Sequence, residues 1–175
     1  MPIIPVKTYY LEISKKTIKD LKEAPQKSAI SPWIPSSKEY LKLYNEVGGK
    51  WGWSGRNIMS NTELKNILTS NNTKLYTISF QNEIAGFSEL GINNNEVELK
   101  YFGLKPKFLG KGLGGYFLEW SIQRAWSYKP QKVSVHTCEY DHPSALNLYI
   151  KYGFSLVKEQ IDQEFYTDAF LKTIE

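Results

Sequence analysis

The strongest constraint on the fold is a glycine-rich turn that leads directly into a predicted helix. Four glycines fall within the six residues Gly110-Lys111-Gly112-Leu113-Gly114-Gly115. Glycines ahead of a helix let main-chain N–H groups converge on an anion, and the helix dipole adds positive potential there. We therefore expect a phosphate-bearing ligand at this turn. The helix that follows carries an apolar stripe at helical spacing, formed by Leu113, Phe117, Leu118, Ile122 and Ala125.

The same glycines have three other interpretations, which are two nucleotide-binding motifs and a turn that binds no ligand. Gly110, Gly112 and Gly115 formally match the dinucleotide fingerprint GxGxxG, but residues 131–137 contain no acidic residue to hold the ribose. A Walker loop needs Ser or Thr after its lysine, whereas Lys111 is followed by glycine. The sequence disfavours both patterns, and a turn with no ligand remains the alternative to phosphate binding.

The remaining periodicity predicts one domain of mixed α/β class. A chain of 175 residues with 41% hydrophobic side chains can fill one core but is too short for two ordinary domains. Three central strands joined by short turns predict an antiparallel meander, so we expect a mostly antiparallel sheet flanked by helices. Strands are expected at residues 6–13, 28–33, 74–80, 84–90, 97–104, 133–138 and 154–157. Helices are expected after a capping box formed by Ser36 and Glu39, around Leu64, from Leu113, and from Pro143 with His142 as its N-cap.

Composition narrows the classes of partner and the cellular location. The 22 Lys and Arg exceed the 18 Asp and Glu by four, a modest excess beside the basic faces of nucleic-acid binders, so no nucleic-acid partner is expected. Binding of DNA or RNA through scattered lysines stays as an alternative. Apolar runs fall short of the roughly 18 residues that span a bilayer, and no leader pattern is visible. We expect a cytoplasmic protein without a membrane partner, in which the single Cys138 forms no internal disulfide.

Two motifs resemble those of the GNAT superfamily of acyl-CoA-dependent N-acetyltransferases. The first is Leu104-Lys105-Pro106 followed by the segment 109–114, which is similar to the family's Gln/Arg-x-x-Gly-x-Gly/Ala. The second is Ala145 with Tyr149 and Gly153-Phe154, similar to the family's Asn-x-x-Ala-x-x-x-Tyr and terminal Gly-Phe. The joint match covers about residues 28–160 and is more specific than either motif alone. The Trp-x-Trp-x-x-Arg loop further resembles a small bacterial subgroup.

The resemblance implies acetyl-CoA as cofactor, bound along one strand and at the glycine turn. Gly103 is expected to allow a close approach or a bulge in that strand. Leu109 replaces the family's Gln or Arg and His142 replaces its Asn, which places the side-chain contacts of those two positions in doubt. The cofactor-binding residues implied are Phe102, Gly103, Leu104, Leu109, Gly110, Lys111, Gly112, Leu113, Gly114, Gly115, His142 and Tyr149.

Two residues are candidates for proton transfer. Tyr149 lies four residues after Ala145 on the same helical face, and the resemblance places its hydroxyl near the thioester sulfur as general acid. Its alternative is a core aromatic. Glu98 occupies the position where some family members carry a carboxylate base, and its alternative is one exposed acid on a strand. A water chain or a neutral amine can replace it as base.

The acceptor pocket is expected beside the tryptophan loop. Aromatic walls hold apolar or cationic groups and arginine clamps a carboxylate, so Trp51, Trp53 and Arg56 are candidate substrate-binding residues, with Glu89 and His136. A merely packed loop is the alternative. His136, Cys138, Asp141 and His142 lack any recognised zinc spacing, so we expect no metal, and strand neighbours two apart need not orient as nucleophile and base.

These observations predict a single GNAT domain over residues 1–175, with residues 1–27 as an N-terminal strand and a lysine-rich surface extension. The predicted activity is transfer of an acetyl group from acetyl-CoA to a primary amine of a small molecule or peptide, by a monomer or homodimer. The alternative is a non-catalytic acyl-CoA-binding sensor or interaction module, which the departures at Leu109 and His142 keep open.

Overall fold

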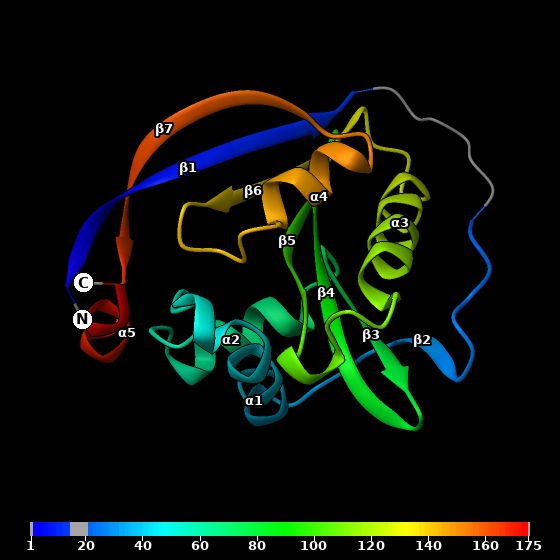
Figure 1. The fold of residues 1–175 in the computed structure, drawn as a ribbon, viewed down its shortest axis with the longest axis horizontal. Helices are drawn as coiled ribbons and strands as arrows, with labels where there is room; N and C mark the ends of the chain where they lie inside the picture. Colours follow the sequence, from blue (N-terminus) through cyan, green and yellow to red (C-terminus); the bar gives the residue numbers. More distant parts are fainter. Residues whose placement is uncertain (1, 15–20, 175) are drawn as a thin grey trace.

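A computed structural model describes residues 2–14 and 21–174, in which seven strands form one sheet with helices on both faces (Figure 1). The strands are β1 (Ile3–Ile13), β2 (Ser28–Pro32), β3 (Thr73–Phe80), β4 (Glu83–Asn93), β5 (Glu96–Leu104), β6 (Lys132–Cys138) and β7 (Ser155–Phe165). The α-helices are α1 (Ser37–Gly48), α2 (Asn61–Thr69), α3 (Leu113–Trp126), α4 (Ala145–Lys151) and α5 (Asp168–Ile174).

The sheet has the order β2-β3-β4-β5-β6-β1-β7 and is mostly antiparallel, as predicted. Only β5 and β6 run parallel, and they pair over a short stretch from Glu96 opposite Lys132 to Leu99 opposite Val135. The predicted meander is confirmed as β3-β4-β5. The N-terminal strand β1 lies inside the sheet, between β6 and β7, so it is an integral part of the fold.

Two hydrophobic clusters hold helices to opposite faces of the sheet. One cluster joins α3 and α4 to β-strand residues such as Leu99 and Val135, and the predicted apolar stripe of α3 is buried there. The other joins α1 and α2 to Leu75 and Phe87. Alternate residues of a strand point to opposite faces, which is why β3 contributes Leu75 to one cluster and Ile78 to the other.

Local signals fix the ends of the first two helices. Ser36 and Glu39 form a capping box at the start of α1, as predicted, and Ser60 and Glu63 form a second one at the start of α2. Among the described residues no helix has both the length and the apolar character to cross a bilayer.

Two predictions of elements differ from the structure, and a third lies partly outside the described residues. The fourth helix begins at Ala145 with Ser144 as N-cap, so the placement of Pro143 in its first turn and of His142 as N-cap was wrong. The His142 ring instead accepts a hydrogen bond from the Ser144 N–H, 3.1 Å away, which holds the turn before the helix. The last strand extends to Phe165, well beyond the predicted residue 157, and α5 follows it. The lysine-rich stretch predicted as a surface extension lies partly outside the described residues, at 15–20.

Candidate active site

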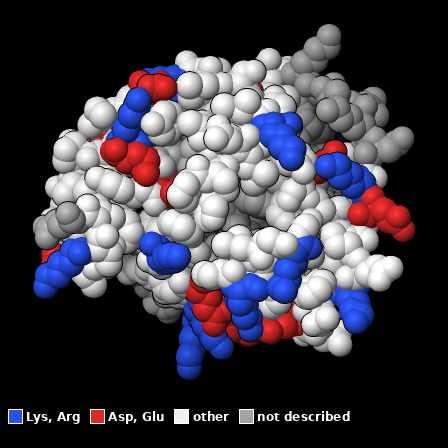
Figure 2. All heavy atoms as spheres, viewed as in Figure 1, with Lys and Arg blue, Asp and Glu red and all other residues white. Residues whose placement is uncertain are grey.

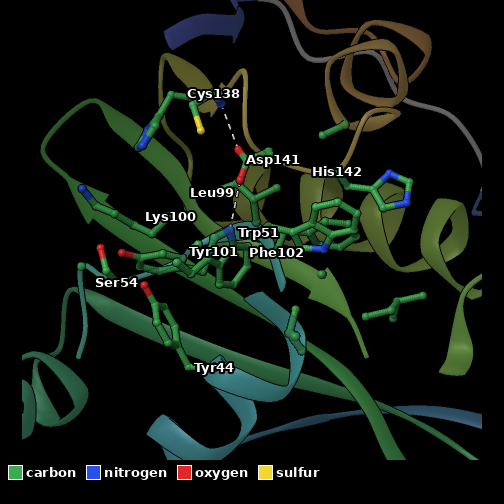
Figure 3. A pocket seen from close by; sticks show the side chains of 18 of the residues that line it. Tyr44, Trp51, Ser54, Leu99, Lys100, Tyr101, Phe102, Cys138, Asp141 and His142 are labelled. Atoms are coloured by element: carbon green, nitrogen blue, oxygen red, sulfur yellow. Dashed lines mark hydrogen bonds between the residues drawn. The ribbon is translucent and has the colours of Figure 1, made fainter. Parts of the chain in front are cut away.

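A pocket opens where β5 and β6 diverge. Their pairing ends at Leu99 opposite Val135, and from Lys100 onward the β6-facing edge of β5 has no strand partner in the described sheet. The gap between the two strands forms part of a pocket of about 300 Å³, which Figure 3 shows from close by. In Figure 2 the middle of this face is hollowed and nearly free of charge, and its lower rim carries both Lys or Arg and Asp or Glu side chains.

The divergence begins at a bulge. Glu89 lies opposite Tyr101 and Leu90 opposite Leu99, so Lys100 is the extra residue on β5. Of the two alternatives predicted for Gly103, a close approach or a bulge, the structure shows a close approach, since a Cβ there would lie 2.6 Å from Val47 Cγ1 of α1. The absence of a side chain therefore lets α1 pack against β5 at the wall of the pocket.

The glycine turn has the geometry of an anion cradle. Gly112 is the N-cap of α3 with φ +76° and no side-chain cap, and Gly110 has φ +74°. A Cβ on either glycine would meet no atom within 4 Å, so neither is required by packing. The first N–H groups of a helix have no partner within the helix, and here no side chain caps them. These residues fit the diphosphate of acetyl-CoA.

The other residues of the turn have distinct surroundings. Leu109 and Gly114 line the pocket, and Leu113 is fully buried in the core, so only its main chain can reach a ligand. Gly115 is explained by packing, because a Cβ there would lie 2.2 Å from the Tyr152 hydroxyl oxygen.

Tyr149 is a residue of α4 and lines the pocket. It is 7% exposed and its ring packs edge-on against Phe154 at 5.8 Å. Within the described part of the chain its hydroxyl has no hydrogen-bond partner. Burial, followed by the negative charge of Asp141, raises the pKa of Tyr149. The hydroxyl therefore keeps its proton at neutral pH and is free to donate it.

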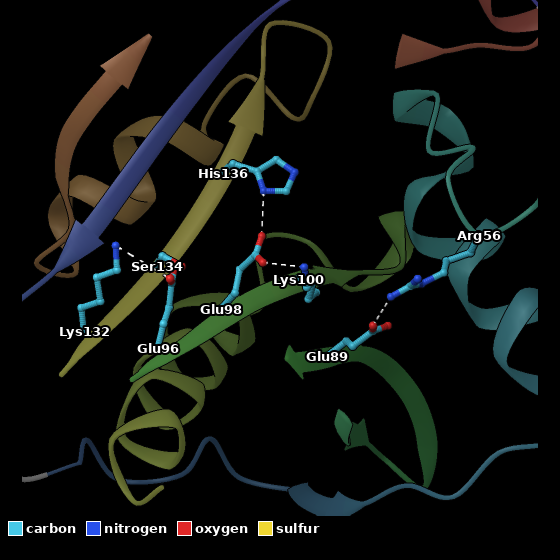
Figure 4. A network of polar contacts seen from close by, with 8 residues as sticks. All are labelled: Arg56, Glu89, Glu96, Glu98, Lys100, Lys132, Ser134 and His136. Carbon is cyan, nitrogen blue, oxygen red and sulfur yellow. Dashed lines mark hydrogen bonds and ion pairs between the residues drawn. The ribbon is translucent and has the colours of Figure 1, made fainter. Parts of the chain in front are cut away.

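His136 and Glu98 form a polar pair at the edge of the gap (Figure 4). His136 Nδ1 lies 3.0 Å from a Glu98 carboxylate oxygen, and Lys100 Nζ lies 2.6 Å from the other. Burial acts to raise the pKa of Glu98, but the hydrogen bonds from His136 and Lys100 outweigh it and lower that pKa to about 2. The hydrogen bond to Glu98 raises the pKa of His136. His136 lines the pocket, whereas Glu98 lies behind it.

Asp141 ties the tryptophan loop to the end of β6 (Figure 3). Its carboxylate accepts hydrogen bonds from Trp53 Nε1 at 3.1 Å, Thr137 Oγ1 at 2.6 Å and the Cys138 N–H at 2.9 Å. The ring centroids of Trp51 and His142 lie 4.9 Å apart in an edge-to-face arrangement. The loop therefore forms a wall of the pocket, and the substrate-binding role of Trp51 and Trp53 stays a prediction.

Cys138 also faces the pocket. Burial, followed by the charge of Asp141, raises the pKa of its thiol to about 11, so it is not a thiolate nucleophile at neutral pH. No group of three or more His, Cys, Asp or Glu side chains among the described residues is arranged to hold a metal ion.

Arg56 and Glu89 pair with each other beneath the pocket and do not line it. Both are buried, their side chains form an ion pair, and Glu89 also accepts a hydrogen bond from the Tyr40 hydroxyl. Burial is the largest single influence and lowers the pKa of Arg56, but the Glu89 carboxylate together with Tyr40 and Tyr101 outweighs it, so that the pKa of the guanidinium is raised. The prediction that Arg56 clamps a substrate carboxylate therefore needs correction, since its charge is already neutralised by Glu89.

β7 and the residue after it also line the pocket, which was not predicted from the sequence. Glu164, Phe165 and Tyr166 line the pocket because β7 pairs with β1 beside β6. The Glu164 side chain is exposed, but partial desolvation of its carboxylate raises the pKa of Glu164, and His136 acts in the opposite direction. No local signal pointed to these residues, since nearly every side chain of β7 is exposed and the strand lacks an alternating pattern.

A family profile matches this chain over most of its length. The profile of the Acetyltransferase (GNAT) family matches residues 39–154, which include the glycine turn, the diverging strands and Tyr149. The chain belongs to this family, as the two motifs predicted. The family's cofactor, acetyl-CoA, agrees with the cofactor expected from the sequence.

Solved structures agree with the fold. The chain superposes on an N-acetyltransferase from Sphaerobacter thermophilus with TM-score 0.66 and 11% identity, covering 92% of this chain and 52% of that longer one. A GNAT acetyltransferase from Elizabethkingia anophelis with acetyl-CoA bound gives TM-score 0.59 at 24% identity, over 76% and 79% of the two chains. An aminoglycoside acetyltransferase from a soil metagenome gives TM-score 0.63 at 16% identity, over 83% and 99%. No curated protein sequence gave a significant match.

Proposed function

We propose that the chain is an N-acetyltransferase that moves the acetyl group of acetyl-CoA to a primary amine of a small molecule or peptide. The observation that carries the proposal is the gap between β5 and β6, with the anion cradle near its mouth and the Tyr149 hydroxyl inside it. Structural similarity to an enzyme with acetyl-CoA bound and to an aminoglycoside acetyltransferase supports it. Acetyl-CoA would supply a thioester, whose acetyl carbon is the electrophile.

The residues of the pocket have distinct roles in this proposal. The Gly110–Gly114 main chain would hold the diphosphate, and the unpaired edge of β5 over Phe102–Leu104 would pair with the pantetheine arm. Trp51 and His142 would close the other side. Main-chain N–H groups in the gap would also replace water as hydrogen-bond donors to the thioester carbonyl.

Proton transfer needs an acid for the departing sulfur and a base for the incoming amine. Tyr149 is the proposed acid, because its hydroxyl is protonated and has no partner among the described residues. Glu98 was predicted as base, but with a pKa of about 2 and no surface in the pocket we propose that it acts through His136. In this arrangement Glu98 is a positioning residue, and His136, or water beside it, accepts the proton of the amine.

Calorimetry with acetyl-CoA and an assay of thiol release test the proposal. We expect saturable binding and release of free thiol when amines are added. Binding without thiol release from a broad amine panel would instead favour an acyl-CoA-binding module, and absence of binding would refute the assignment of the site. A ligand that binds only the native state also raises the melting temperature, which gives an independent readout.

A further inference from the structure

The part of the pocket beyond the gap is lined by aromatic rings and one carboxylate. We call this part the acceptor end and define it by Tyr44, Trp53, Tyr101, His136, Glu164 and Tyr166. The residues come from α1, the tryptophan loop, β5, β6, β7 and the segment after it, so the site exists only in the folded chain.

Three of these aromatic side chains, Tyr44, Trp53 and Tyr101, pack against one another as one wall, which we call the aromatic wall. Ring centroids lie 5.3 Å apart for Tyr44 and Trp53, 5.0 Å for Tyr44 and Tyr101, and 5.1 Å for Trp53 and Tyr101. Labelled side chains in Figure 3 show Tyr44 and Tyr101 close together at the pocket wall. Such a wall gives apolar contact to a substrate body and attracts cations through the ring faces.

The cations near the acceptor end already have partners. Lys100 and His136 both contact Glu98, and Arg56 is paired with Glu89 behind the aromatic wall. The carboxylate of Asp141 is likewise engaged, since it accepts three hydrogen bonds from its surroundings. A carboxylate on the substrate would find no unpaired positive group among the described residues of this end.

Glu164 is the exception, because its carboxylate has no hydrogen bond or ion pair with any described residue while it lines the pocket. Glu164 is paired with Ile4 of β1 in the sheet. Its carboxylate is close enough to interact electrostatically with His136, Tyr101 and Tyr166 of the acceptor end. An uncompensated carboxylate beside aromatic walls is suited to an ammonium group.

We propose that the acceptor is a cationic amine with an apolar body and no carboxylate, and that Glu164 is the residue that selects it. The inference rests on the proposed acetyl transfer and names its substrate class. Glu164 binds the ammonium form, which releases one proton to water before the neutral amine attacks, and the aromatic wall holds the body of the substrate. An amino acid with the same side chain is rejected, because its carboxylate is placed in a site with negative charge and no free cation.

Matched substrate pairs test the inference. Phenethylamine and phenylalanine, tryptamine and tryptophan, and hexylamine and norleucine differ chiefly by a carboxylate on a similar carbon framework. We expect the amine of at least one pair to bind with about tenfold or greater preference over its amino acid, both in calorimetry without acetyl-CoA and in kcat/KM. Equal binding within each pair, a preference for the amino acids, or no binding by any pair would overturn the inference.

The variant Glu164→Gln tests the role of Glu164, and Glu159→Gln is its control. Loss of the charged partner is expected to raise KM for the amine about 10- to 100-fold, the usual range for a hydrogen bond to a charged group. Acetyl-CoA affinity should change less than twofold. Glu159 lies on the same strand but pairs with Lys7 outside the pocket, so its variant should behave as wild type.

The two proposals fail in different ways. If wild type does not bind acetyl-CoA, the proposed function fails. If wild type binds acetyl-CoA and acetylates an amine, but Glu164→Gln leaves KM for that amine unchanged, only the assignment of Glu164 fails.

Discussion

Replacing Gly112 by alanine separates the anion cradle from general stability. Gly112 has φ +76°, which costs an L-residue about 1–2 kcal/mol. No atom lies within 4 Å of the new Cβ, so steric overlap adds nothing to this cost in the folded chain. For a domain of 175 residues, about 2–4 °C per kcal/mol gives a fall in Tm of about 2–8 °C.

The effect on acetyl-CoA should exceed the effect on stability. Relief of the strain turns the peptide N–H groups of the turn away from the ligand, and one lost hydrogen bond to a charged oxygen is worth about 1.5–3 kcal/mol. We therefore expect acetyl-CoA affinity to fall about 10- to 150-fold in titration calorimetry.

Gly153→Ala is the matched control. Gly153 also has positive φ, +103°, and a Cβ at this position would lie no closer than 3.9 Å to its nearest neighbour, Ile13 Cδ1. This variant should lose stability to a similar extent and keep its affinity within twofold. If Gly112→Ala lowers Tm but binds acetyl-CoA as wild type does, the cradle is not where the diphosphate binds.

Three further predictions follow from the pocket and the ion pairs. Tyr149→Phe should lower kcat at least tenfold with acetyl-CoA affinity within twofold, and equal turnover in steady-state kinetics would remove Tyr149 as acid. Glu98→Gln should reduce stability and alter the pH–rate profile. Folding lowers the pKa of Glu98, so the stability that its charge contributes is present above the unfolded pKa and is lost as pH falls from about 5 toward 2. Folding raises the pKa of His136, so the stability that its charge contributes is complete below about pH 6.5 and is lost as pH rises. The Tm difference from wild type should therefore be largest at about pH 5–6.5, and a difference that does not vary with pH would contradict the pairing. Glu89→Met should lower the free energy of unfolding by about 3–5 kcal/mol in denaturant titration, because it leaves Arg56 buried without its partner. Adding Arg56→Met should recover part of that loss, and additive losses in the double variant would show that the two residues are not coupled.

Local sequence signals were sufficient for most helices and strands. The capping box at Ser36 and Glu39, the apolar stripe of α3 and the three strands of the meander are each encoded within a few residues. The start of α4 was misplaced because Pro143 and His142 form a turn that is stabilised by the hydrogen bond between Ser144 and the His142 ring. Proline and a capping side chain give the same local signal in either arrangement.

The sequence by itself determined the glycine turn, the helix after it and the family, because each depends on residue types at short, fixed spacing. Only the tertiary structure decided which side chains share the pocket. β7 is an edge strand in which no residue is fully buried, so no periodicity marks Glu164, and its position follows from pairing with β1 more than 150 residues earlier. The same holds for Arg56 and Glu89, whose burial as an ion pair depends on how α1, the tryptophan loop and β4 pack together. Contacts across such separations are set by strand register and core packing, which local sequence patterns do not reveal.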